Sequence, residues 1–125
     1  MNEQQAATFK ARAVELGGQK AGAEQAFRHA RAARSAATQA VAGDRSRKGE
    51  LDEARKQFAF AKAWRLETDR LIYHFETEVA QAIGRAGNTY LVAATEIDVM
   101  RALRSSARPA PEPSAEIRQA IEQLA

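Results

Sequence analysis

The chain has 125 residues, no cysteine, three prolines and a formal net charge of +3, a length that supports one domain or a compact domain with a tail. Alanine occupies 29 positions, whereas valine and isoleucine together occupy only ten, so the composition argues against a β-sandwich or barrel and favours closely packed helices. The lack of cysteine excludes a disulfide framework and a cysteine-ligated zinc site, and no apolar run approaches the roughly 20 residues of a membrane span.

The first predicted helix covers residues 2–48. Its apolar and small residues recur at alternating spacings of four and three, as in the seam of a left-handed coiled coil. Two polar residues, Lys20 and Arg34, interrupt this seam. Its other members are Phe9, Ala13, Leu16, Ala23, Phe27, Ala30, Ala37 and Val41.

Three glycines weaken this first helix, namely Gly17, Gly18 and Gly22. Each lowers helix stability by roughly 1 kcal/mol relative to alanine. Either the helix breaks near Gly17, or another helix approaches its backbone closely there. We favour a continuous but weakened helix.

The first clear interruption is the sequence GDRSRKG at residues 43–49. Its cations suit the negative end of a helix, and Gly49 is expected at the C′ position that follows a helix. Glu50, Asp52 and Glu53 then supply the negative charge that favours the start of the next helix. The segment therefore predicts a short turn between two helices.

A second helix is predicted over residues 50–83, with a length of about 50 Å at 1.5 Å per residue. Its seam includes Phe58 and Phe75, which we expect to be buried, and Trp64 widens the apolar stripe. The short turn folds this helix back onto the first as an antiparallel helical hairpin. The expected neighbours across the hairpin are Phe27 with Arg65, Leu16 with Phe75, and Phe9 with Ile83.

A third, shorter helix is predicted over residues 89–106, with Asn88 as its N-cap. The three prolines of RPAPEP, residues 108–113, exclude a helix and favour an extended linker. Ser114 is expected to cap a last amphipathic helix, which reaches residue 125. The expected apolar face of the third helix consists of Leu91, Ala94, Ile97, Met100 and Leu103.

The predicted organisation is thus a helical hairpin and bundle domain at 1–107, a proline-rich linker at 108–113 and a short amphipathic C-terminal helix at 114–125. An isolated helix of about three turns is marginal in water and needs a surface to lie on. The extended linker spans roughly 19 Å. We expect it to carry the last helix clear of its own hairpin, into a groove on a neighbouring subunit or partner.

One short run resembles a known repeat. Residues 49–54, with Phe58 and Ala61, resemble the second helix of a tetratricopeptide repeat, in which alternating small and large residues pack closely. The preceding helix departs from that repeat, since Arg45 stands where a tyrosine is expected, and no second copy follows at a period of 34 residues. We interpret the run as convergent alanine–phenylalanine packing.

The residues offer little catalytic chemistry. Neither His29 nor His74 has the preceding glutamate of a di-iron bundle, and His74 with Glu78 provides at most one edge of a metal site. We interpret that pair as exposed polar residues on one helix face. The sequence also lacks a Gly-x-Ser-x-Gly motif and a phosphate-binding loop. We therefore predict a protein that is not an enzyme and has no metal or cofactor.

A basic strip extends from residue 28 to residue 48 and contains six cations and one anion, Asp44. Such a strip can bind phosphates in a salt-dependent way, although no aromatic residues alternate with its cations to stack on bases. The alternative is that its first arginines pair with Glu67 or its neighbours on the returning helix. The strip consists of Arg28, Arg31, Arg34, Arg45, Arg47 and Lys48.

The sequence predicts an all-α, non-enzymatic structural or assembly protein that acts through helix–helix contacts in a homo-oligomer or larger complex. A phage virion or a secretion apparatus would suit such a component, and the alternative is a small basic nucleic-acid-associated protein. The first residues are polar and lack the layout of a signal peptide, so we expect a cytoplasmic protein, or one within a virion if it is of phage origin. Large apolar residues off the seams mark interaction sites. The expected partner or oligomer interface consists of Phe60, Trp64, Leu66, Ile117, Ile121 and Leu124.

Overall fold

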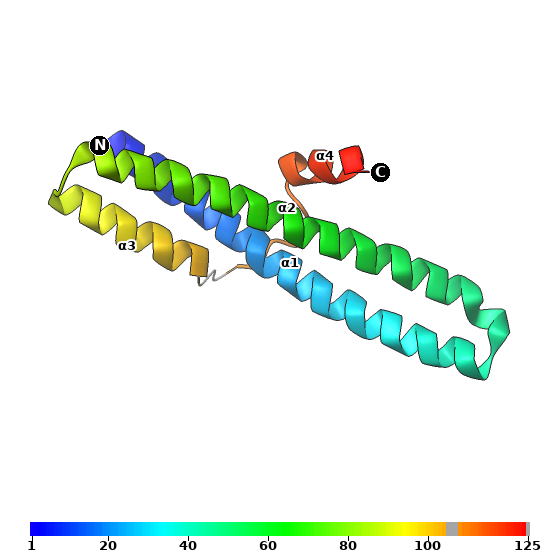
Figure 1. The fold of residues 1–125 in the computed structure, drawn as a ribbon. Helices are drawn as coiled ribbons and strands as arrows, with labels where there is room; N and C mark the ends of the chain where they lie inside the picture. The colour runs from blue at the N-terminus through cyan, green and yellow to red at the C-terminus, as the bar shows by residue number, and fades with distance from the viewer. Residues whose placement is uncertain (105–107, 125) are drawn as a thin grey trace.

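A computed structural model of the chain describes residues 1–104 and 108–124. Within these residues the chain is all-α and contains no strand. Two long helices form an antiparallel hairpin along the whole molecule, and two short helices pack onto it (Figure 1). The predicted fold is therefore confirmed. The helices are α1 (Glu3–Gly43), α2 (Lys48–Ala86), α3 (Tyr90–Arg104) and α4 (Ala115–Leu124), and a 3-10 turn, η1 (Arg45–Arg47), joins the first two.

The helix ends differ in detail from the prediction. The first helix ends at Gly43, because Asp44 turns the chain and accepts hydrogen bonds from the hydroxyl and the N–H of Ser46, at 2.6 and 3.0 Å. The Ser46 hydroxyl and then its N–H lower the pKa of Asp44 below the ordinary value. Gly49 lies inside the first turn of α2, so its expected role as a C′ residue is wrong.

Thr89, rather than Asn88, caps α3, since the Val92 N–H donates to its hydroxyl at 3.2 Å. The last helix is capped by Ser114 as predicted, with the Ile117 N–H donating to the Ser114 hydroxyl at 3.4 Å. The predicted end of the third helix, the domain boundary at residue 107 and the last residue of the C-terminal helix lie outside the described residues.

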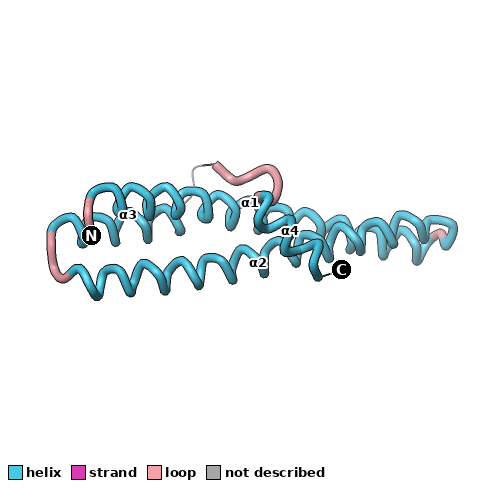
Figure 2. The backbone as a smooth tube through the Cα atoms, turned by 90° about the horizontal axis from the view of Figure 1, so that it is seen from above, coloured by secondary structure: helices cyan, strands magenta, loops and turns pink. Residues whose placement is uncertain are grey.

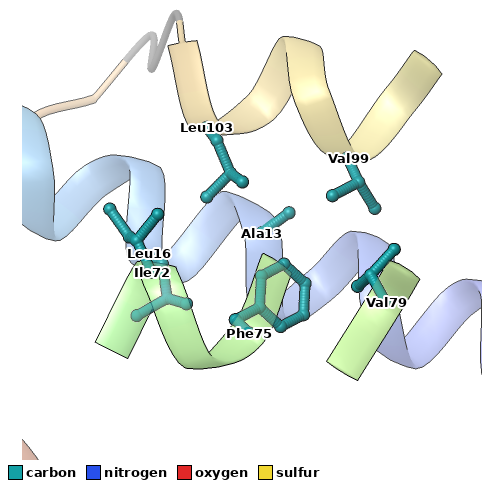
Figure 3. Packing of buried hydrophobic residues seen from close by; sticks show 7 residues of the cluster. All are labelled: Ala13, Leu16, Ile72, Phe75, Val79, Val99 and Leu103. Carbon is teal, nitrogen blue, oxygen red and sulfur yellow. The ribbon is translucent and has the colours of Figure 1, made fainter. Parts of the chain in front are cut away.

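The main core forms where three helices meet (Figure 3). Every predicted seam residue of α1 is buried or half-buried, and the predicted neighbours Leu16 and Phe75 share one cluster. Phe9 packs edge-on against the Phe75 ring, with centroids 6.1 Å apart. The buried members of the cluster are Ala13, Leu16, Ile72, Phe75, Val79, Val99 and Leu103.

The predicted face of α3 is wrong. Ile97 and Met100 remain 54% and 43% exposed. Successive steps of three residues fall short of the 3.6-residue turn, so the predicted stripe rotates away from one side of the helix. The buried face consists of Val92, Thr95, Val99 and Leu103.

The linker crosses α1 at Gly18 and Gly22 (Figure 2). The Ala110 N–H donates to the Gly18 carbonyl oxygen at 2.9 Å. A Cβ atom at Gly22 would overlap the Ala110 carbonyl oxygen, and one at Gly17 would overlap a carbonyl oxygen near the end of α3. The favoured continuous helix is confirmed, and the glycines also permit close approach of the chain on two sides.

The linker does not carry the last helix clear of its hairpin, and that prediction is wrong. Ile117 is fully buried against Ala23 and Trp64 of the same chain. A salt bridge of 3.0 Å between Arg12 and Glu116 also ties α4 to α1. The linker instead packs against the α1 backbone at Gly18 and Gly22, and this path leads α4 back onto its own hairpin.

The short helices cover only part of the hairpin. The third helix packs mainly against α1 and the fourth against α2, on opposite sides of the hairpin (Figure 1). Toward the η1 turn, the hairpin continues as a pair of helices. We call residues 27–62 the distal arm and the remainder of the hairpin the base. Phe58, predicted to be buried, is half-buried because it lies in this thinner arm.

Candidate interaction surfaces

A buried amide holds the C-terminal segment in place. The side-chain oxygen of Gln19 accepts hydrogen bonds from the Trp64 indole N–H at 2.8 Å and from the Ser114 N–H at 3.2 Å. Its side-chain nitrogen donates to the Glu112 carbonyl oxygen at 3.3 Å. Gln19 thus joins α2, the linker and the start of α4. No pattern in the sequence singles out Gln19, although a buried tryptophan N–H requires an acceptor.

The predicted interface residues do not form one surface. Trp64 and Ile117 are buried inside the chain, at 3% and 0% exposure, so their assignment to an intermolecular surface is wrong. Ile121 is half-buried against the same internal cluster. Part of the wide apolar stripe on α2 is therefore covered by α4 of the same chain.

The exposed part of the predicted interface is divided. Phe60, Leu66 and Leu124 are exposed, at 38%, 58% and 69%. Phe60 and Leu66 are six positions apart on α2, which separates their directions by about 120° on a helix of 3.6 residues per turn. They therefore belong to different sides of the hairpin.

An open groove lies on the distal arm next to α4 and the linker. Its volume is about 1080 Å³, and the linker closes one end. Small side chains form most of its α1 wall, whereas aromatic side chains lie on its α2 wall. We call it the alanine groove, and its principal lining residues are Ala26, Ala30, Ala33, Phe60, Ala61 and Trp64.

A second groove separates α3 from α2, because α3 leans mainly on α1. Its volume is about 330 Å³. Its floor is apolar and includes Ile72, Val79 and Met100, whereas Glu76 and Glu96 stand among its charged lining residues. We call it the α2–α3 groove. Lys20 and Arg104 also line it, and both belong to the segments nearest the distal arm.

The basic strip divides into engaged and available cations. The Arg47 guanidinium forms a salt bridge of 2.7 Å with Glu50. Glu67 pairs with Arg70 at 2.8 Å, so the alternative in which it pairs with the first arginines of the strip is wrong. Four exposed cations of the strip form no ion pair with the described residues, namely Arg28, Arg31, Arg45 and Lys48.

Two half-buried aromatic rings lie between Arg34 and Arg65 where the two long helices pair. The guanidinium carbon of Arg34 lies 3.8 Å from the Phe58 ring centroid, and that of Arg65 lies 4.7 Å from the Phe27 ring centroid. The two rings are 5.2 Å apart. The antiparallel pairing of α1 and α2 brings these four side chains together. The contact between Phe27 and Arg65 confirms that they are neighbours, as predicted. Cation–π contacts of this kind stabilise a thin helix pair.

The histidines are both exposed, and the His74 ring contacts Tyr73 edge-on at 5.8 Å. Among residues 1–104 and 108–124, no group of three or more His, Asp or Glu side chains could hold a metal ion. In that same part of the chain, none of the helices combines the length and apolar character needed to cross a membrane. Comparison with known protein families, curated proteins and solved structures found no match to this chain.

Proposed function

We propose that this chain is a non-enzymatic assembly protein that acts through helix–helix contacts, in a homo-oligomer or a larger complex. The observation that carries the proposal is the distal arm, which is only two helices thick beyond the linker and α4 (Figure 1). The seam residues Phe27, Val41 and Phe58 of the arm are only half-buried and Phe60 is exposed, so a further helix would bury additional apolar surface. A virion or a secretion apparatus, or the cytoplasm in general, is the setting we propose.

The alanine groove supports this proposal. Small side chains let another helix approach closely, because the distance between packed helices depends on the side chains at the contact. The exposed ring of Phe60 borders this groove and provides an apolar anchor. Aromatic anchors in such positions commonly dominate the energy of a protein interface.

Sedimentation equilibrium of the full chain tests the proposal. We expect a mass above the 13.7 kDa of a single chain, with dissociation on dilution. Phe60→Asp should weaken the part of the association that uses the alanine groove, because it places a charge on the apolar rim of that groove. Val14→Asp is the matched control, since Val14 is 62% exposed on the base. A single-chain mass at every concentration would contradict self-assembly.

A second candidate function is binding of nucleic acid, supported by the four cations of the strip that form no ion pair with described residues. Phosphate binding predicts an affinity that falls steeply between about 50 and 200 mM salt. Replacing Arg45 and Lys48 with glutamine should reduce the salt dependence of binding to a labelled DNA or RNA strand. If no strand binds at low salt, this candidate is excluded.

A further inference from the structure

We infer that the distal arm receives α3 of a second copy of this chain, in an antiparallel dimer with two-fold symmetry. The arm of each copy lies on the base of the other. This inference rests on the proposed function, because it specifies the partner and the surface of self-assembly. Three features of one face carry it, namely its stepped shape, its segregated charge and its exposed apolar residues.

The stepped shape arises because α3 covers only the base. Gly17 of α1 lies against Ala102 near the end of α3, so residues 21–43 of α1 extend beyond α3, and the linker crosses the start of this range at Gly22. That length is about 34 Å, whereas α3 is about 22 Å long at 1.5 Å per residue. When two copies are placed face to face and antiparallel, the raised α3 of each meets the recessed arm of the other.

The first arginines of the basic strip lie on this face. Arg28 and Arg31 follow Gly17 by 11 and 14 positions, which returns them to within about 40° of its direction on an α-helix. Since Gly17 faces α3, both residues lie on the side of the arm where α3 has ended, and Arg28 also lines the edge of the alanine groove. Residues 25–43 contain three arginines and no aspartate or glutamate, so this part of the recess is basic.

The raised part of the face carries two acidic side chains, whereas the cations of the same groove, Lys20 and Arg104, belong to the segments nearest the distal arm. Glu76 and Glu96 line the α2–α3 groove, and both are exposed. Neither forms a salt bridge with another described residue. On α3, the exposed Ile97 and Met100 supply apolar surface beside these acids. In the antiparallel arrangement, the two glutamates of one copy face the two arginines of the other.

One face of the chain contains a recessed basic part and a raised part with acidic side chains. Because these two parts are complementary to each other, the partner we infer is a second copy of the chain. A two-fold interface requires that one surface be complementary to itself, so that each contact occurs twice. This face contains the recessed arm with Arg28 and Arg31. It also contains the raised α3, with Glu76 and Glu96 in the groove beside it. Complementary charges of this kind fix the register and orientation of an interface.

Charge reversal tests the inference through the oligomeric mass. Arg28→Glu/Arg31→Glu places acid against acid, and Glu76→Lys/Glu96→Lys places base against base. We expect each variant alone to be monomeric at concentrations where the unmodified chain is dimeric. An equimolar mixture of the two variants should restore the dimer mass, because their reversed charges are complementary. Circular dichroism should show unchanged helicity, since all four side chains are exposed.

Each alternative outcome is informative. If the unmodified chain associates and both variants keep its mass, this surface is wrong while self-assembly stands. If the variants dissociate and their mixture stays monomeric, the antiparallel pairing is wrong. A monomeric unmodified chain overturns both the inference and the self-assembly. If Arg28 and Arg31 bind only nucleic acid and not a second copy, Glu76→Lys/Glu96→Lys will leave the oligomeric mass unchanged. The same variant will then bind DNA more tightly.

Discussion

Gly17 and Gly22 are two positions where one added methyl group would collide with backbone atoms. A Cβ at either residue would overlap a carbonyl oxygen, of Ala102 or of Ala110. Helix propensity alone would favour alanine at both positions. The glycines therefore lower the stability of α1 locally while allowing α3 and the linker to pack against its backbone.

Gly17→Ala should destabilise the protein by about 1–3 kcal/mol, the usual cost of overpacking. This cost exceeds the gain of up to about 1 kcal/mol from helix propensity. The free energy of unfolding in urea, monitored by circular dichroism, measures the difference. Gly84→Ala is the matched control, because its added Cβ meets nothing within 4 Å, and it should stabilise α2. Equal effects of the two substitutions would contradict the close approach of α3.

At the scale of an element, α4 depends on its docking site. Ten residues are too few for a stable isolated helix, and Ile117 is the only residue of this helix that is fully buried. Its side chain packs against Trp64, the single tryptophan of the chain. Undocking of α4 would therefore expose a natural fluorescent probe to water.

Ile117→Ala should weaken the docking of α4 by about 2–5 kcal/mol, as for other large buried side chains. We expect the Trp64 emission to shift to longer wavelength and the helix content to fall by about the share of α4, while the hairpin stays folded. Leu124→Ala, at a residue that is 69% exposed, should change neither signal. An unchanged emission in the Ile117 variant would show that other contacts hold the helix.

At the scale of the whole molecule, the base and the distal arm differ in the number of helices that protect them. The base combines the main core with the cluster under α4. The arm relies on the Arg34–Phe58 and Phe27–Arg65 contacts and on a row of small residues. Regions with fewer buried apolar contacts open with a lower free energy.

Hydrogen exchange should therefore show a gradient along α1 in the dilute, monomeric protein. Amides of residues 6–23 should exchange more slowly than amides of residues 27–43, because α3 and α4 protect only the former group. Mass spectrometry of peptic fragments measures both groups in one experiment. Protection of the arm should rise with protein concentration if a second copy covers it. Uniform protection at low concentration would contradict the division into base and arm.

Sequence periodicity predicted the helices, the hairpin and its seams, because these depend on local patterns and one short turn. The spacing of Leu16 and Phe75 about the turn was sufficient to pair them correctly. The same reasoning failed for α3, where Ile97 and Met100 were assigned to the buried face. Its short segment offers two apolar stripes, and only the packing against α1 selects between them.

The sequence by itself determined an all-α chain with two long amphipathic helices, since a repeat of four and three places one stripe on each helix. Only the tertiary structure decided the path of the linker over Gly18, the buried contacts of Gln19 and the stacking of Arg34 on Phe58. Each of these contacts joins residues far apart in the chain, so no local pattern encodes it. The division of the interface residues into buried and exposed groups has the same cause, because α4 returns to cover Trp64.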